Sequence, residues 1–295
     1  MPSKYIACLF ASVVVVSAVQ AQAASSAIEK ISQTKTITLG YRESSVPFSY
    51  LDNEQKPIGY SIDLCSHVVS HLKEQLKLDQ LDVKYLPVNS ANRMPLIKNG
   101  TIDIECGGTS SSPERMQEVA FSVATFVSQP RWLVKSNSGI QSPADLAGKA
   151  VVVTQGSNAV PLAKKLIADG LNARMLQGKD HAESMLMLEQ GRASAFLEDD
   201  ILLAAKKAEA RDPSMFTILP EGYAKTYYGL MLPKDDAPLK DAVDATLKQM
   251  MLSGDFVKVY DTWFTRPIAP HNTNLNVQLS EGLQERIKQP SDQPF

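Results

Sequence analysis

Residues 105 to 115 read Glu105-Cys106-Gly107-Gly108-Thr109-Ser110-Ser111-Ser112-Pro113-Glu114-Arg115, and this stretch is the most informative part of the chain. Residues 101–104 read as a short strand that runs into two glycines, and glycine lets the backbone approach a ligand closely. Four hydroxyl residues follow, and Pro113 suits the first turn of a helix. The free N–H groups of a helix start attract anions, and an arginine there can hold a carboxylate through two parallel hydrogen bonds. The segment therefore predicts a site for a small anion.

Strand and helix patterns alternate on both sides of this stretch. Alternating or continuous apolar residues predict strands at 36–40, 81–86, 150–154 and 193–197. Helical spacing predicts helices at 61–76, 94–100, 158–168 and 200–210, with a short one at 280–287 in a tail rich in Pro, Asn and Gln. The pattern is that of an α/β fold, in which ligand sites lie at the carboxyl ends of strands.

Several further motifs are spread from Thr34 to about Pro267. They are Pro47-Phe48-Ser49-Tyr50, Gly59-Tyr60-Ser61-Ile62-Asp63-Leu64, Asn99-Gly100-Thr101-Ile102-Asp103, Asp145-Leu146-Ala147-Gly148-Lys149 and Val151-Val152-Val153-Thr154-Gln155-Gly156. With the opening stretch they resemble the periplasmic solute-binding proteins of ABC-type amino-acid importers, and within these the glutamate/aspartate-binding branch. The resemblance implies a two-lobed periplasmic binding protein (type II), with a ligand cleft between the lobes and two hinge crossings.

The same resemblance divides the chain. We expect a signal peptide at 1–23, a first lobe formed by 24–126 plus 226–295, which includes the C-terminal tail, and a second lobe at 127–225. The hinge crossings are expected near 125–129 and 222–227.

The start of the chain is typical of a secretory signal peptide. Lys4 precedes an apolar run at 5–19, and Ala21-Gln22-Ala23 is an A-x-A cleavage pattern. We therefore expect a cleavable signal and a periplasmic protein without membrane insertion. Cleavage removes one of 30 basic residues and none of 32 acidic ones, so the net charge becomes about −3. This balance argues against nucleic-acid partners.

Two cysteines, Cys65 and Cys106, remain after cleavage. In an oxidising compartment they could pair. The sequence does not show that they meet, so a buried free thiol is the simpler interpretation.

Candidate ligand-binding residues of the first lobe follow strands or open helices. Arg42 comes directly after the first strand, a place where binding groups concentrate. Alone, it would usually be solvated. The resemblance implies that Arg42, Ser90 and Arg93 bind the ligand's side-chain carboxylate, the last two matching a Ser-x-x-Arg pattern. It also implies that Arg115, with Ser110 beside it, binds the α-carboxylate. The plainer interpretations are a helix cap and surface charges.

The second lobe supplies the other candidates. Ser157 opens a predicted helix, and the resemblance places His181 near the ligand side chain and Asp199 on its ammonium. A lone histidine is more often structural, and Ser157 could simply cap its helix. The chain departs from the branch at Gly108, where serine is usual, and at Asn158, where threonine is usual. Two ligand-facing hydroxyls could thus be missing, and restoring them is expected to tighten binding.

Three arginines against one Asp199 carboxylate complement a ligand with two carboxylates and one ammonium, since buried ligand charges must be paired. We therefore expect capture of L-glutamate or L-aspartate by a monomer, and its delivery to an inner-membrane ABC permease. No cofactor and no metal site is expected.

Three alternatives remain. One is an enzyme on the same fold, similar to cyclohexadienyl dehydratase, with Asp199 or Glu105 as general acid. The nearby arginines argue against it because they favour ionised carboxylates. The others are a binding protein for a different amino acid and a ligand-sensing module of a receptor.

Overall fold

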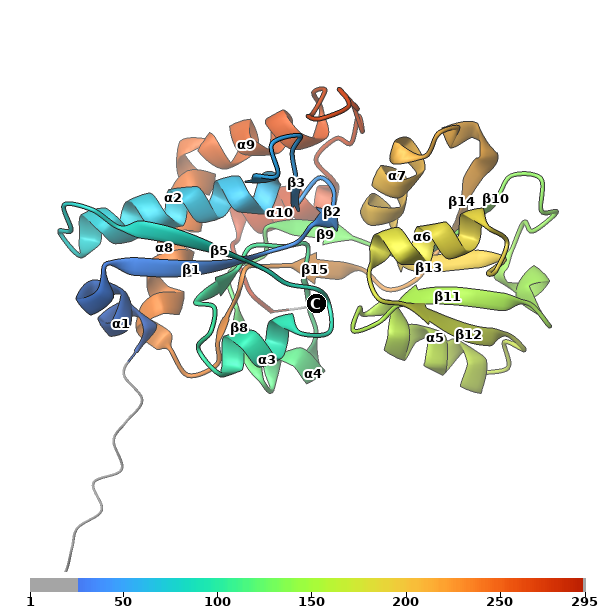
Figure 1. Cartoon of the computed structure of the whole chain (residues 1–295), viewed down its shortest axis with the longest axis horizontal. Helices are drawn as coiled ribbons and strands as arrows, with labels where there is room; N and C mark the ends of the chain where they lie inside the picture. The colour runs from blue at the N-terminus through green and yellow to red at the C-terminus, as the bar shows by residue number, and fades with distance from the viewer. Residues whose placement is uncertain (1–25, 294–295) are drawn as a thin grey trace, which may run out of the picture.

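The computed structural model describes residues 26–293, and the predicted signal peptide at 1–23 lies outside them. Two five-stranded sheets, each covered by helices, form two bodies that lie side by side (Figure 1). The predicted α/β fold with two lobes is confirmed.

The first sheet is built from both ends of the described chain. Its strand order is β5-β1-β6-β16-β8, with β1 parallel to β5 and β6, and β16 antiparallel to β6 and β8. The strands are β1 (Thr36–Tyr41), β5 (Asp82–Pro87), β6 (Ile104–Glu105), β8 (Val119–Phe121) and β16 (Met231–Pro233). The helices of this body are α1 (Ala27–Thr34), α2 (Tyr60–Gln75), α3 (Arg93–Lys98), α4 (Pro113–Met116), α8 (Ala237–Ser253), α9 (Asp255–Phe264) and α10 (Glu281–Lys288).

A small hairpin sheet, β2 (Ser44–Ser45), β3 (Ser49–Leu51) and β4 (Pro57–Ile58), leads into α2. Gly59 joins β4 to α2 with φ +135°, and a Cβ there would lie 2.4 Å from the Phe48 carbonyl oxygen. Only glycine accepts both that dihedral and that contact. The turn seats Phe48 among the rings of Tyr60, Phe126, Tyr228 and Phe264, which form a buried aromatic cluster.

The second sheet has the order β12-β11-β13-β10-β14. Its central strand pairs in parallel with β11 and antiparallel with β10. The strands are β10 (Pro130–Lys135), β11 (Ala150–Thr154), β12 (Arg174–Gly178), β13 (Ala195–Asp199) and β14 (Phe216–Gly222), and the helices are α5 (Ala159–Ala168), α6 (His181–Glu189) and α7 (Asp200–Glu209), with 3-10 turns at Pro143–Leu146 and Pro213–Met215. Apolar clusters lie on both faces of the sheet, as the continuous apolar run of β11 requires.

The chain passes between the two bodies twice. The passages are β9 (Phe126–Ser128) and β15 (Thr226–Tyr228), which pair antiparallel, and β15 also pairs with β7 (Ser110–Ser111). Both lie where the sequence predicted crossings. Two of the four hydroxyl residues of the opening stretch thus form a strand beside the crossings, which the sequence did not predict.

Two predicted strands differ from those observed. The strand expected at 101–104 is reduced to Ile104–Glu105, and the strand expected at 193–197 is Ala195–Asp199. The second shift matters because it makes both Glu198 and Asp199 strand residues, fully buried at the carboxyl end of the sheet.

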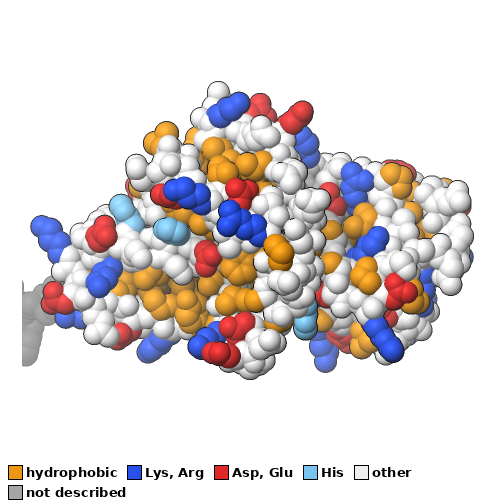
Figure 2. All heavy atoms as spheres, turned by 90° about the horizontal axis from the view of Figure 1, so that it is seen from above, with side chains coloured by type: hydrophobic (Ala, Val, Ile, Leu, Met, Phe, Trp, Pro, Cys, Tyr) orange, Lys and Arg blue, Asp and Glu red, His pale blue; other side chains and the backbone are white. Residues whose placement is uncertain are grey.

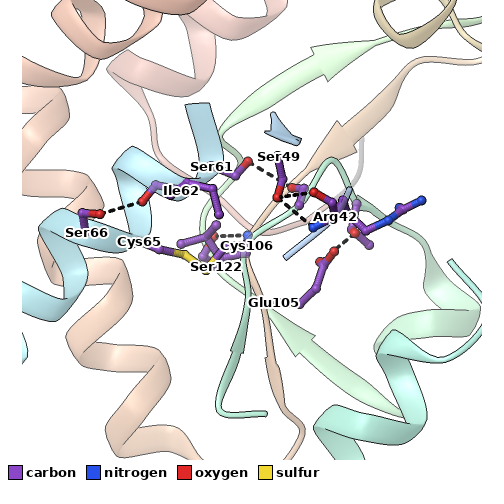
Figure 3. Close-up of a disulfide and its surroundings, with 12 residues drawn as sticks. Arg42, Ser49, Ser61, Ile62, Cys65, Ser66, Glu105, Cys106 and Ser122 are labelled. Carbon is purple, nitrogen blue, oxygen red and sulfur yellow. Dashed lines mark hydrogen bonds between the residues drawn. A yellow bond between two sulfur atoms is a disulfide. The ribbon is translucent and has the colours of Figure 1, made fainter. Parts of the chain in front are cut away.

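The expectation of free thiols is wrong, because Cys65 and Cys106 form a disulfide with an S–S distance of 2.07 Å. Figure 3 shows Cys65 of α2 reaching Cys106, which directly follows β6. Successive strand residues point to opposite faces, so Cys106 faces α2 while its neighbour Glu105 points toward Arg42. The pairing of α2 with this strand end is a tertiary contact that sequence spacing does not encode.

The surface is mixed in charge. On the face in Figure 2, acidic and basic side chains are interspersed, and no large area carries one sign. Among residues 26–293, no helix combines the length and apolar character needed to cross a bilayer.

Candidate functional site

The predicted site residues converge from both bodies on the space between them. Arg42, Ser90, Arg93, Ser110 and Asp199 are each at least 95% buried, and Gly108 is buried too. Ser157 and His181 are buried as well, and Arg115 and Asn158 lie partly exposed at the rim. The structure therefore brings all ten candidates to one region.

Arg42 is the most unusual member of this group. Its backbone N–H donates to Ser49 Oγ at 2.8 Å, which fixes the residue at the end of β1. Its Nη1 and Nη2 atoms are buried and have no hydrogen-bond partner. Burial, with the nearby Arg93, lowers the pKa of Arg42 to about 10. A buried charge without partners costs several kcal/mol, so this guanidinium favours an anion beside it.

Arg93, the first residue of α3, belongs to a hydrogen-bonded chain of buried side chains. Arg93 Nη1 donates to Thr109 Oγ1, whose hydroxyl donates to Glu105 Oε2 at 2.7 Å. Arg93 Nη1 also lies 3.7 Å from Glu105 Oε1. Arg93 Nε and the Ser90 hydroxyl remain without partners. The chain fixes the orientation of Arg93 and leaves part of its hydrogen-bonding capacity unused.

Arg115 donates hydrogen bonds both within residues 105–115 and to the second body. Its Nη1 donates to Ser110 O at 2.7 Å and to Ser110 Oγ at 2.9 Å. Its Nη2 donates to Gly156 O at 3.0 Å. Gly156 has φ +76°, and a Cβ there would lie 2.6 Å from the main chain of Ser90. The two bodies are therefore in direct contact beside Arg115.

Asp199 accepts hydrogen bonds from three side chains. Tyr228 Oη donates to it at 2.6 Å, Thr226 Oγ1 at 3.1 Å, and Asn158 Nδ2 at 3.3 and 3.4 Å to its two oxygens. Asn158 thus orients Asp199. The resemblance implied only that a ligand-facing hydroxyl, supplied by threonine in the branch, is missing at this position. Tyr228 and Thr226 belong to β15, so Asp199 links the second sheet to a crossing strand.

His181 opens α6, whose N-cap Asp180 accepts from Glu183 N–H. The Ser184 hydroxyl donates to Asp180 O, so the Thr154 hydroxyl must donate to Ser184 Oγ. Thr154 Oγ1 can then only accept from His181 Nδ1, 3.0 Å away. Burial and the nearby Arg42 hold the pKa of His181 well below its usual range. His181 is therefore neutral, with its proton on Nδ1 and a lone pair on Nε2.

The surroundings of Gly108 argue against the expectation that a serine at this position tightens ligand binding. A Cβ at this position would lie 3.0 Å from the Phe48 ring and 3.3 Å from Tyr228. Phe48 is held by the aromatic cluster and has little freedom to move. A serine at 108 would therefore be crowded, and the expected gain in binding from restoring this hydroxyl does not follow. The site is packed around glycine.

The charge count made from the sequence is also incomplete, because two further carboxylates are buried here. Glu105 is fully buried and Glu198 is 1% exposed. The arginines do not keep every carboxyl in its usual range: burial, with the neighbouring Asp199, raises the pKa of Glu198 to about 8, and burial also raises the pKa of Asp199. Sequence analysis did not select Glu198, Thr109, Thr154 or Tyr228.

A cleft of about 660 Å³ opens between the bodies at Arg115. One wall is formed by the opening stretch and the other by the start of α5 and the second crossing, and its residues include Ser111, Ser112, Arg115, Gly156, Ser157, Asn158, Pro161, Tyr223 and Tyr227. Within residues 26–293, no cluster of three or more His, Cys, Asp or Glu side chains has metal-binding geometry.

Known proteins resemble this chain over most of its length. It is 43% identical over 273 residues to the glutamate/aspartate import solute-binding protein of Escherichia coli, covering 92% of this chain and 90% of that protein. It is 45% identical over 269 residues to the L-glutamate/L-aspartate-binding protein of Pseudomonas aeruginosa, covering 90% and 88%.

Among solved structures, an ancestral amino acid-binding protein described as a precursor of cyclohexadienyl dehydratase superposes with a TM-score of 0.71 at 26% identity, over 81% of this chain and 99% of that one. The model of the bacterial extracellular solute-binding proteins, family 3, matches residues 37–266. With a family match over most of its length and these full-length relatives, the chain belongs to the bacterial extracellular solute-binding proteins of family 3.

Proposed function

We propose that this protein captures an acidic amino acid, L-glutamate or L-aspartate, in the periplasm and delivers it to an ABC-type permease of the inner membrane. The buried guanidinium of Arg42, with two unpartnered nitrogens, is the observation that carries the proposal. It favours a ligand with an anionic side chain. The names of the relatives at 43–45% identity support the same ligands.

Each end of the ligand has partners of matching charge. Arg42, Arg93 and Ser90 take the side-chain carboxylate, because each has a buried donor without a hydrogen-bond partner. Arg115 and Ser110 take the α-carboxylate, and Asp199 takes the ammonium. His181, Ser157 and the backbone at Gly108 complete the enclosure. A neutral His181 presents an acceptor, so it suits a hydrogen-bond donor of the ligand.

The division into lobes follows from the two crossings. We place residues 26–126 and 226–293 in the first lobe and residues 127–225 in the second. The ligand contacts groups of both lobes, so its affinity is highest in the closed arrangement, and that difference drives closure. β9 and β15 absorb the rotation as hinges. The protein acts as a monomer.

An enzyme on this fold is the second candidate, and Glu198 is the observation that favours it, since a general acid requires a carboxyl with a raised pKa. The resemblance to an enzyme precursor is more distant, at 26% identity, than the resemblance to the import proteins. Transport therefore remains the better-supported function.

The division of roles among the arginines is testable with single variants. Arg115→Ala is expected to weaken every amino-acid ligand, whereas Arg42→Ala weakens glutamate and aspartate selectively and leaves any binding of glutamine or asparagine in place. Each lost charge-assisted contact costs about 1.5–3 kcal/mol. Calorimetry with the four amino acids measures both effects.

A stability measurement separates a binding defect from a folding defect. Removing the unpartnered Arg42 charge is expected to leave thermal stability of the ligand-free protein unchanged or higher. Arg174→Ala, on the exposed edge strand β12, serves as the matched control and binds like the wild type. Equal losses for acidic and neutral ligands in Arg42→Ala contradict the assignment.

A further inference from the structure

Glu198 is a buried carboxyl inside the proposed site that the proposed ligand contacts do not use. It is the penultimate residue of β13, and its Oε1 accepts from Asp199 N–H at 3.1 Å. Its Oε2 is buried without a hydrogen-bond partner and lies 3.5 Å from His181 Nδ1. An unpartnered buried carboxylate oxygen is costly, and protonation removes that cost.

His181 does not neutralise Glu198. The donor chain from Thr154 through Ser184 to Asp180 commits the Nδ1 proton to Thr154. Burial holds the pKa of His181 well below its usual range, so the ring carries no charge. Among the described ion pairs, no arginine or lysine lies within 4.0 Å of Glu198. The negative charge of Glu198 would therefore have no direct cationic partner.

The surroundings of Glu198 also decide which of two adjacent carboxyls holds a proton. Asp199 accepts from three side-chain donors, whereas Glu198 has the Asp199 N–H and the Ser157 hydroxyl. Asp199 thus holds the charge and Glu198 the proton. Several charged or titratable groups surround Glu198. They are Asp199 beside it, Arg131 opposite on β10, His181 at α6, Arg42 after β1, Arg93 on α3, Arg115 on α4 and Tyr228 on β15.

We propose that Glu198 couples ligand capture to proton uptake, because it faces the same arginines as the side-chain carboxylate of an acidic ligand and must be protonated when the lobes close on that ligand. The inference rests on the proposed function. An ionised Glu198 would compete with the ligand for Arg42 and Arg93 and repel its carboxylate. Glu198 therefore also determines specificity, because the side-chain carboxylate of the ligand can enter only when Glu198 is protonated.

The sign of the pH dependence follows from this exchange. We expect opening of the lobes to hydrate Glu198, and its pKa then lies in the ordinary range, at about 4.3. In the closed site burial raises its pKa to about 8. Between these values closure takes up a proton, so binding is strongest at the acidic end and weakens as pH rises, by up to about tenfold per unit. Arg42, Arg115 and Tyr228 do not titrate in this window.

The test uses ligand-stripped protein and L-glutamate from pH 6 to pH 8.5, with calorimetry at pH 7 in phosphate and in Tris to count protons. The wild type is expected to lose affinity by about three- to tenfold per pH unit and to take up close to one proton. Glu198→Gln keeps the shape of the protonated carboxyl, so its affinity is flat with pH and exceeds that of the wild type at pH 8 by about a thousandfold. His181→Gln, the control for the other titratable group, keeps the slope.

Each outcome has one meaning. Wild-type affinity that is flat with pH, without proton uptake, overturns the inference even if Glu198→Gln cannot be folded. A slope that persists in Glu198→Gln assigns the proton elsewhere and also overturns it. Failure of glutamate and aspartate to bind at any pH overturns the proposed function itself, and the inference with it.

Discussion

Replacement of Asp199 by asparagine is expected to weaken binding of L-glutamate and L-aspartate by about 2–5 kcal/mol, at least about 30-fold. Asp199 is the proposed partner of the ligand ammonium, and its oxygens already face Tyr228, Thr226 and Asn158. The asparagine NH₂ group would point a donor at donors, and the ammonium would lose its countercharge. Calorimetry measures the loss.

The same variant tests closure. Solution scattering is expected to show a smaller radius of gyration when the wild type binds ligand, and a weaker change in Asp199→Asn at the same ligand concentration. Asp169→Asn is the control: its side chain pairs with Lys165 at the exposed end of α5, away from the site. A loss below tenfold, or full closure of Asp199→Asn at that concentration, contradicts the role of Asp199.

The largest effect on stability is expected from removing the disulfide. Cys65 and Cys106 are 41 residues apart, and closing such a loop restricts the unfolded chain by about 4 kcal/mol. Urea unfolding of the double variant Cys65→Ser/Cys106→Ser should show a loss of about 2–4 kcal/mol. The double alanine variant separates loop closure from the cost of buried hydroxyls. Reductant should destabilise the wild type and leave both variants unchanged. Stabilities within 0.5 kcal/mol of the wild type would show that the bond contributes little.

Local sequence patterns predicted most of the helices and strands. β11 was predicted at its observed bounds because four apolar residues in a row, ending at Thr154, are typical of a buried parallel strand. The crossings were placed by resemblance, and β9 and β15 lie there. Pairing across long separations was not predictable: the disulfide depends on how α2 packs on the first sheet, and no spacing rule joins residues 65 and 106.

The sequence predicted which residues form the site, but it did not predict the hydrogen bonds that join them. The arginines were selected by the resemblance, because their places after a strand or at a helix start do not by themselves distinguish a ligand contact from a surface charge. The hydrogen bond from Tyr228 to Asp199 joins residues of two different sheets, so no local signal announces it. Glu198 was overlooked because the resemblance gave it no role, and its burial beside Asp199 became visible only in the structure.

The central claim, capture of an acidic amino acid, is tested most directly by calorimetry on refolded, ligand-stripped protein against a panel of the common amino acids. Refolding removes any amino acid that co-purifies in the closed site. The account predicts that glutamate, aspartate or both bind at about micromolar affinity or tighter, near −8 kcal/mol, and more tightly than the rest of the panel. Tight binding of a neutral or basic amino acid, with no response to glutamate or aspartate, would contradict it.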